Sequence, residues 1–439
     1  MADFTAREQL MLELINRARM NPDAEADRYN ISLNEGVSSS NRISSSPKEV
    51  LAGNDKLGTA ASSHSKWMLR NDKFAHVETK GTPDFYEETF TKRITKAGYT
   101  YLTGGENIAY IAAGGSLDLT KTIFDMHRNF FVDVGISGRG HRVNILGEGY
   151  REIGIGHEAG TYNGMNASMV TTDFGTRANT VFITGVVYDD IIEDDDFFSV
   201  GEQTAGRNVS SGDASDFTGE GGGYELEYAW PGGTKTVTFN LATGSVEAVV
   251  ALNKTNVKVD VVNGDEIWTN ASSLTSLSEN VTELHALGIG KVKLVGTDAN
   301  EKIVGNSANN KLTGNGGNDN LKGGGGKDVI NGGIGKDKMS GGSSDDTFVF
   351  KTALASTVAT PDIVKDFGDS GKDRIDLHAL GNLAYRDEAK FNDVMQVRVT
   401  KDGSDVIVHI NLSGDKADEM RIVLDNTSLS SMDKGDFIL

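Results

Sequence analysis

The chain of 439 residues contains no cysteine and only 5 prolines. Without cysteine there is no disulfide, no thiolate nucleophile and no zinc site built on sulfur. Basic residues are scarce as well, since 43 lysines and arginines face 63 aspartates and glutamates, for a formal net charge of −20. This charge disfavours nucleic acids and anionic membranes as partners and favours hard cations. No apolar run nears the roughly 18 residues of a membrane-spanning helix, so we expect no transmembrane segment.

The amino terminus does not fit the pattern of a secretory signal peptide, and we expect none there. Asp3, Glu8 and Glu13 interrupt the stretch that such a signal keeps apolar. We therefore expect either a cytoplasmic protein or one exported by a route that recognises a different address. Glycine, in contrast, is abundant: 53 of the 439 residues are glycine, well above the roughly 7% of an average protein. With so few prolines these glycines do not indicate collagen.

The glycines concentrate in a repeat of nine residues that begins at Gly296. Six units follow in register: GTDANEKIV, GNSANNKLT, GNGGNDNLK, GGGGKDVIN, GGIGKDKMS and GGSSDDTFV. The eighth position is always apolar, at Ile303, Leu312, Leu321, Ile330, Met339 and Phe348. The sixth position carries Glu301, Asn310, Asp319, Asp328, Asp337 and Asp346. A fixed period of this kind predicts a solenoid, and the apolar residue in register argues against a flexible linker.

The period also predicts a chemistry. If each apolar residue points inward, stacking the turns brings the acids of successive turns close together. Two such charges about 5 Å apart repel by roughly 0.8 kcal/mol even in water. Calcium neutralises such a row well, because it accepts six to eight carboxylate and carbonyl oxygens in flexible geometry.

The units GGGGKDVIN and GGIGKDKMS resemble the RTX nonapeptide of calcium-binding parallel β-rolls. The resemblance implies that Asp side chains and turn carbonyls bind Ca²⁺ between turns. It places the ligands at Asp319, Asp328, Asp337, Asp346, Gly314, Gly316, Gly323, Gly325, Gly332, Ile334 and Gly341. The first two units depart from the pattern, because Glu301 and Asn310 stand where Asp is expected. We expect those turns to stack without metal or to bind it weakly.

The segment after the repeats resembles the end of RTX proteins. Residues 362–377, DIVKDFGDSGKDRIDL, are similar to the strands that cap the roll. The ending DKGDFIL resembles an uncleaved type I secretion signal, although a last strand explains it equally well taken alone. With the repeats, it implies a secreted, extracellular protein exported by a type I system.

The amino-terminal third has a mixed pattern. Thr5 and Glu8 form a capping box, which predicts a helix from about Ala6 to just before Pro22. Further helices are expected at 59–71, after Thr82-Pro83, and at 118–131. Strands are expected at 152–157, 167–174 and 181–188. Helices followed by strands that pack on them predict an α+β or three-layer arrangement.

Three stretches of this region carry polar side chains typical of sites: Phe74-Ala75-His76, Gly105-Glu106-Asn107-Ile108-Ala109 and residues 138–146, GRGHRVNIL. Two imidazoles and a carboxylate, if brought together, hold a divalent metal or share protons. Each residue taken singly is better explained as a structural hydrogen-bonding group.

In this order the three stretches resemble the CAP superfamily in its bacterial, cysteine-free branch, over about residues 5–190. The resemblance implies an α-β-α sandwich, and many members of the superfamily carry two His and two Glu in a central cleft. His76, Glu106 and His141 fall on three of those places, as catalytic candidates or Zn²⁺ ligands. The fourth acid has no clear match. The nearest candidates are Asp125 and Asp133, with His127 as an extra member.

Residues 189–202, DDIIEDDDFFSVGE, are strongly acidic. They do not fit an EF-hand loop, so a solvated acidic turn is one interpretation. The stretch also resembles the calcium loop of small bacterial β-sandwich modules, which implies Asp190, Asp194, Asp196 and Glu202 as ligands. Short alternating runs over 205–262 predict a β-sandwich. Its aromatic residues Tyr224, Tyr228 and Trp230 fit core packing or a sugar-binding face.

We therefore expect a multidomain protein. Residues 1–180 form a CAP-like domain, 181–263 a β-sandwich, 264–349 the lead-in and the β-roll, and 350–439 the cap and secretion signal. The expected function is calcium binding, with the CAP domain as a binding or effector module for an unknown lipid, glycan or protein. Two alternatives stay open: a metal-assisted hydrolase at the His/Glu cleft, and a calcium-dependent surface or matrix protein.

Overall fold

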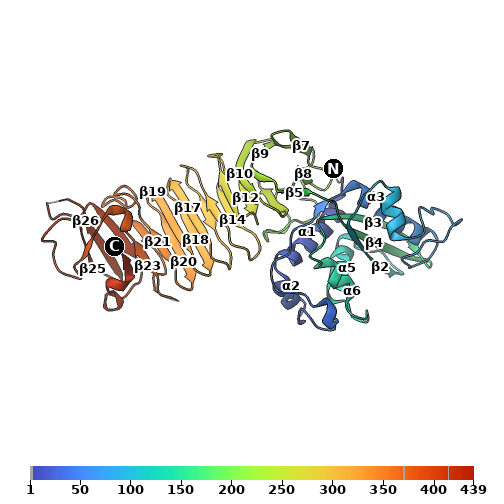
Figure 1. The fold of residues 1–439 in the computed structure, drawn as a ribbon, viewed down its shortest axis with the longest axis horizontal. Helices are drawn as coiled ribbons and strands as arrows, with labels where there is room; N and C mark the ends of the chain where they lie inside the picture. Colours follow the sequence, from blue (N-terminus) through green and yellow to red (C-terminus); the bar gives the residue numbers. More distant parts are fainter. Residues whose placement is uncertain (1–2, 369–370, 414) are drawn as a thin grey trace. The chain divides into compact units, whose positions relative to one another are not determined.

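The computed structural model describes residues 3–368, 371–413 and 415–439, and the chain divides into two compact units. The N-terminal unit comprises residues up to Gly244 together with Leu252–Gly264, and the C-terminal unit comprises Ser245–Ala251 and Asp265–Leu439. Figure 1 shows helices only sparsely outside the N-terminal unit and a long run of parallel strands in the C-terminal unit. No helix in the described residues is long and apolar enough to cross a membrane.

A four-stranded sheet with the order β1-β3-β4-β2 forms the centre of the N-terminal unit. Its strands are β1 (Ala52–Gly53), β2 (Thr103–Ala113), β3 (Glu152–Tyr162) and β4 (Met165–Thr176). The accompanying helices are α1 (Ala6–Met20), α2 (Pro22–Arg28), α3 (Asp55–Arg70), α4 (Phe90–Lys96), α5 (Leu119–Val132) and α6 (Gly140–Ile145), with the 3₁₀ turn η1 (Ser39–Asn41).

Helices α3 and α5 cover opposite faces of this sheet. Side chains three positions apart on a strand point to opposite faces. On β4, Thr171 is hydrogen-bonded to Ser65 of α3 at 2.9 Å, whereas Ser168 accepts a hydrogen bond from Thr122 of α5 at 2.8 Å. The sheet is therefore a middle layer between helices.

The helix ends follow from their caps. The capping box at α1 forms as predicted, since Glu8 Oε2 accepts from the Thr5 amide at 2.9 Å. Helix α3 begins four residues earlier than expected, because the side chain of Asn54 caps it. Helix α4 begins only at Phe90, because Glu78 holds the preceding loop by accepting a hydrogen bond from the Tyr86 amide at 2.7 Å.

The rest of the N-terminal unit is built from strands. β5 (Thr180–Tyr188) pairs with β8 (Gly223–Ala229) and β11 (Val257–Val262), while β6 (Asn208–Ser211) pairs with β7 (Ala214–Phe217) and β9 (Gly233–Leu241). These strands join the helical part in one compact unit across the boundary expected at residue 180. Lys258 Nζ pairs with Glu13 at 2.9 Å, and Asn256 Nδ2 donates to Val50 O at 2.9 Å.

The C-terminal unit contains the roll, and its parallel strands confirm the β-roll prediction. One run of neighbouring strands is β13 (Ser273–Ser276), β15 (Lys293–Val295), β17 (Lys311–Gly316), β19 (Val329–Ile334), β21 (Thr347–Val349), β23 (Arg374–Asp376) and β28 (Phe437–Ile438), with β10 (Gly244–Leu252) antiparallel to β13. The other is β12 (Glu266–Thr269), β14 (Glu283–Ala286), β16 (Lys302–Val304), β18 (Asn320–Gly325), β20 (Lys338–Ser343), β22 (Asp362–Val364) and β27 (Met420–Leu424).

The register shows how the repeat coils. Leu294 pairs with Leu312, Leu312 with Ile330, and Ile330 with Phe348. The two residues of each pair lie 18 positions apart in the sequence, so two nonapeptides complete one turn of the coil. The apolar eighth residues of all six units are fully buried, as predicted.

The end of the chain closes this unit with antiparallel strands. β25 (Gln396–Asp402) pairs with β26 (Asp405–Asn411), β26 with β27, and β24 (Ala384–Tyr385) lies beside β25. The 3₁₀ turns are η2 (His378–Leu380), η3 (Leu429–Ser431) and η4 (Lys434–Asp436). The terminal Phe437-Ile438 pairs with β23, as a last strand does, and its role in export stays a prediction.

The contact between α3 and β3 depends on glycine. A Cβ at Gly156 would lie 2.1 Å from Ser62 N, a backbone atom of α3 that cannot move aside. We expect Gly156→Ala to lower the free energy of unfolding of the N-terminal unit by about 3 kcal/mol, at the upper end of overpacking effects. Chemical denaturation measures this change.

Gly160→Ala is the matched control on the same strand. Its Cβ would meet only the Leu69 side chain, at 3.3 Å, and this side chain can rotate. Equal losses in the two variants would contradict the close approach at Gly156.

Candidate functional site

Two rows of polar side chains run along the roll, one for each side of the coil. We call them row one (Glu301, Asp319, Asp337 and Asp362) and row two (Asn310, Asp328, Asp346 and Asp373). In both rows the Oδ1 atom of each Asp accepts a hydrogen bond from the backbone N–H of the preceding row member. For example, Asp319 N donates to Asp337 Oδ1 and Asp337 N to Asp362 Oδ1, both at 2.9 Å. Each carboxylate is thereby held in one orientation.

The second oxygen of most of these carboxylates has no hydrogen-bond partner. The buried atoms without a partner are Glu301 Oε2 and the Oδ2 atoms of Asp319, Asp328, Asp337, Asp346 and Asp362. A buried charged oxygen without a partner is strongly unfavourable. These rows therefore require either protons or a cation.

The glycine that opens each unit leaves space at these oxygens. A Cβ at Gly314 would lie 2.0 Å from Asp319 Oδ2 and 2.4 Å from the carbonyl oxygen of Gly332. A Cβ at Gly323 would lie 2.2 Å from Asp328 Oδ2 and 2.5 Å from Gly341 O. Carboxylate and carbonyl oxygens from successive turns thus surround one small space, and this donor set fits Ca²⁺.

Burial changes the protonation of the rows. Burial, together with the neighbouring acids, raises the pKa of Asp362 to about 9 and that of Asp319 to about 8. The same burial raises the pKa of Asp328 to about 7, and those of Asp337 and Asp346 to about 6. Without a cation, these carboxylates are protonated well above the pH at which ordinary aspartate ionises.

The remaining predicted roll residues lie in the turns. Gly316 and Gly325 end β17 and β18, and Gly332 and Gly341 supply carbonyl oxygens to the spaces described above. The side chain of Ile334 is exposed, so only its backbone could bind a cation.

The first two units differ from each other. The Nδ2 group of Asn310 donates to Ala308 O at 2.7 Å, so an amide fills the place where a cation would bind. Glu301, in contrast, retains a buried oxygen without a partner.

Sequence reasoning missed Asp362 and Asp373 as row members. They follow their predecessors by 25 and 27 residues instead of 18, so the nine-residue register does not reach them. The signal was nevertheless present, because both precede an apolar strand residue two positions later, Val364 and Ile375, as the repeat acids do.

In the acidic loop, Glu202 organises the backbone. Its carboxylate accepts hydrogen bonds from Ile192 N at 2.9 Å and Ser199 N at 2.7 Å, and it is buried. Asp190 accepts from Asp196 N at 2.9 Å and keeps Oδ1 without a partner. Asp194 is exposed. The loop thus brings Asp190 and Glu202 near the same turn, and calcium binding there stays a prediction.

In the helical part of the N-terminal unit, His76 and Glu106 meet. His76 Nδ1 lies 2.7 Å from Glu106 Oε1, and the buried Arg93 pairs with the other Glu106 oxygen. Although burial alone raises it, contacts with His76 and Arg93 hold the pKa of Glu106 below its usual range. Asp173 of β4 lies deeper: both its oxygens are buried without a partner, and burial next to Glu106 raises its pKa well above normal.

The other predicted cleft residues pair elsewhere. His141 Nδ1 lies 2.8 Å from Asp133 Oδ1, His127 Nε2 lies 3.0 Å from Glu25, and Asp125 pairs with Lys121 on the surface. In the part of the chain that the structure describes, three metal-ligating side chains come within 4.8 Å of one another only in the C-terminal unit. His76, Glu106 and His141 therefore do not form a preassembled zinc site.

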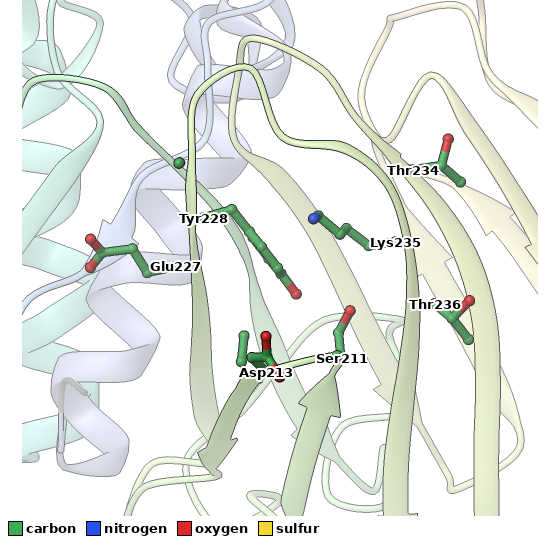
Figure 2. A pocket seen from close by; sticks show the side chains of 10 residues that line it. Ser211, Asp213, Glu227, Tyr228, Thr234, Lys235 and Thr236 are labelled. Carbon is green, nitrogen blue, oxygen red and sulfur yellow. The ribbon is translucent and has the colours of Figure 1, made fainter.

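A pocket of about 670 Å³ lies among β6, β7, β8 and β9 (Figure 2). Figure 2 shows the Lys235 side chain extending toward Tyr228, the hydroxyl end of Tyr228 lying toward Ser211, and Glu227 turned away. The Lys235 ammonium lies 4.4 Å from the centre of the Tyr228 ring, so it occupies one ring face. Tyr224 is buried and donates to Val259 O at 2.7 Å, which is core packing.

Comparison with known proteins identifies the family. The family described as Peptidase M10 serralysin C terminal matches residues 23–439, nearly the whole chain. The chain belongs to this family. Membership in the serralysin C-terminal family, together with the carboxylate rows, supports a secreted calcium-binding repeat protein. No curated protein matches the chain.

Several solved structures are similar over part of the chain. The AlgE6R3 subunit of the mannuronan C5-epimerase of Azotobacter vinelandii is 27% identical, with a TM-score of 0.27, over 33% of this chain and 80% of that one. An extracellular protein containing an SCP domain from Bacillus anthracis str. Ames is 19% identical, with a TM-score of 0.25, over 39% of this chain. The match spans 40% of the length of that protein.

The space at Gly323 permits a direct test of the rows in this serralysin C-terminal family member. We expect Gly323→Ala to weaken Ca²⁺ binding by at least about tenfold, because the new methyl group occupies the space between Asp328 Oδ2 and Gly341 O. Isothermal titration calorimetry on the full chain measures the change. Gly290→Ala, whose Cβ would meet nothing within 4 Å, is the control and should bind like the wild type.

The raised pKa values predict an unusual pH dependence. Because the row carboxyls bind protons more tightly in the metal-free fold than in the unfolded chain, stability in chelator is greatest at low pH. It should fall as the pH rises through about 6 to 9, the range of these pKa values. Thermal unfolding followed by circular dichroism in EDTA at pH 5 and pH 8 measures the difference.

The variant Asp362→Asn sharpens this measurement. It removes the group with a pKa of about 9, so the loss of stability between pH 7 and pH 9 should become smaller. A chelated protein that is more stable at pH 8 than at pH 5 would overturn the assignment.

Proposed function

We propose that this protein is an exported calcium-binding modular protein whose roll is assembled by Ca²⁺. The single observation that carries the proposal is the set of buried row oxygens without partners, of which those of Glu301, Asp319, Asp328, Asp337 and Asp346 lie beside the glycine that opens their unit. Family membership supports the same conclusion.

The physics connects calcium binding to folding. Without a cation the row carboxyls either keep their protons or destabilise the fold. The free energy of Ca²⁺ binding therefore adds to the free energy of folding of the roll. Extracellular calcium modules have dissociation constants of about 10⁻⁴ to 10⁻³ M, so the roll would bind outside a cell and not in a calcium-poor cytosol. An unfolded roll in the cytosol suits passage through a narrow type I channel.

For the N-terminal unit we propose a CAP-superfamily module that binds a ligand or a partner. Half of the His76 side chain is exposed above the buried Glu106 and Arg93, which makes this cluster accessible to a ligand. The pocket next to Tyr228 and Lys235 is a second accessible concavity in the same unit. The ligand class (lipid, glycan or protein) stays open.

A metal-assisted hydrolase at the same cleft is less well supported. Such an enzyme needs a metal held by several side chains, and His141 contacts Asp133 instead of the His76–Glu106 pair. The sequence also contains no His-Glu-x-x-His segment. A calcium-dependent surface protein would differ by self-associating when calcium is added.

The variant Asp337→Asn tests the calcium proposal. An Asn at this position keeps an oxygen for the Asp319 amide but replaces the unpartnered Oδ2 with a neutral amide. In far-UV circular dichroism of the full chain, we expect calcium to restore β-structure that is lost in chelator. Asp337→Asn should raise the calcium concentration at which half of the β-structure is restored by at least about tenfold.

Asp345→Asn is the control. This neighbouring acid is exposed and pairs with Lys327 at 2.6 Å, outside the rows, so its midpoint should match that of the wild type. A spectrum that chelator and calcium leave unchanged would refute the proposal. Sedimentation in the same samples shows whether calcium causes self-association.

A further inference from the structure

A second group of metal-ligating side chains lies at the start of the roll, ahead of the nine-residue repeats. Strands β12 and β14 are parallel, with Glu266 paired with Glu283 and Trp268 paired with His285. Side chains two positions apart on a strand share a face. These four side chains therefore lie side by side on one face, and the three ligating ones are partly exposed.

The ligating atoms are already close together. One ligand atom each from Glu266, Glu283 and His285 lies within 4.8 Å of the other two. His285 Nε2 is 2.7 Å from Glu283 Oε2. Ligands of a tetrahedral zinc ion lie roughly 3.4 Å apart, given bonds of about 2.0–2.1 Å. Small side-chain rotations therefore complete such a site.

Trp268 positions two of the three ligands. Its ring stacks on the His285 imidazole, with centroids 4.1 Å apart and an angle of 6° between the planes. Its Nε1–H donates to Glu266 Oε2 at 3.0 Å. Contacts that orient the metal-binding side chains in this way are typical of metal sites and affect the affinity for the metal.

Charge also favours a cation here. Two carboxylates sit in register on neighbouring strands, where like charges destabilise a sheet. Lys302 of β16 places Nζ 2.6 Å from Glu283 Oε2 and supplies one positive charge. Its side chain is 39% exposed, so it can turn into solvent when a dication binds.

We propose that Glu266, Glu283 and His285 form a binding site for a borderline divalent transition metal such as Zn²⁺. Calcium is the wrong ion for this set, because it takes oxygen ligands and one ligand here is an imidazole nitrogen. The site shares no residue with the carboxylate rows. It leaves a fourth coordination position for water or another ligand.

Calorimetry with ZnCl₂ on the full chain, in millimolar calcium to saturate the rows, tests the site. We expect one saturable Zn²⁺ site whose affinity falls by at least about 100-fold in His285→Ala and in Glu266→Gln. The control is His378→Ala, which removes an exposed histidine that pairs with Asp376 in the same unit. It should bind Zn²⁺ like the wild type.

Two further variants separate metal binding from a structural ion-pair network. Lys302→Met removes the competing cation and should tighten Zn²⁺ binding, whereas a purely structural network would show no gain. Trp268→Phe keeps an aromatic ring on His285 but loses the hydrogen bond to Glu266, so affinity should drop by roughly 10-fold.

Circular dichroism of each variant checks the fold. If His285→Ala does not fold, Glu266→Gln, which keeps the shape of the side chain, decides the outcome. Absence of saturable zinc binding, or binding that Glu266→Gln leaves unchanged, would overturn the proposal.

Discussion

The high cost of burying a charged oxygen without a counter-charge governs this structure. In the N-terminal unit, two buried acids meet cations of the protein itself, since Glu13 pairs with Lys258 and Glu106 with Arg93. The buried Asp173 has no partner, and its strongly raised pKa favours the neutral acid. In the carboxylate rows, one oxygen of each acid accepts from a backbone amide, and the other oxygen of every acid except Asp373 has no partner in the described structure. The same physical problem is thus met by ion pairs and a proton in one unit, whereas the rows of the other unit require protons or an external cation.

This difference follows from the architecture of the roll. A coil with one turn per 18 residues places like residues above one another, so an acid in each repeat produces a row of acids. A lysine long enough to neutralise such a row does not fit, because the space at Gly314 or Gly323 is too small for any side chain. Only a proton or a small ion can enter, and calcium binding and stability are consequently linked.

The first strands of the roll, β12 and β14, are chemically different from the rest. Glu266, Glu283 and His285 lie on the partly exposed face of the strands, where a tryptophan and a lysine complete the group. The buried rows offer only oxygen ligands. One solenoid therefore presents two kinds of cation site, which differ in burial and in ligand type.

From the sequence alone, periodicity determined the roll: the apolar eighth position, the acidic sixth position and the opening glycine all follow from a repeat of nine. The capping box at Thr5 and Glu8 likewise determined where α1 begins, because caps are local. Only the tertiary structure decided which residues meet across long separations. It added Asp362 and Asp373 to the rows, placed His141 against Asp133, and brought Glu266 to His285. Such contacts depend on strand register and packing, and spacing along the chain does not encode them.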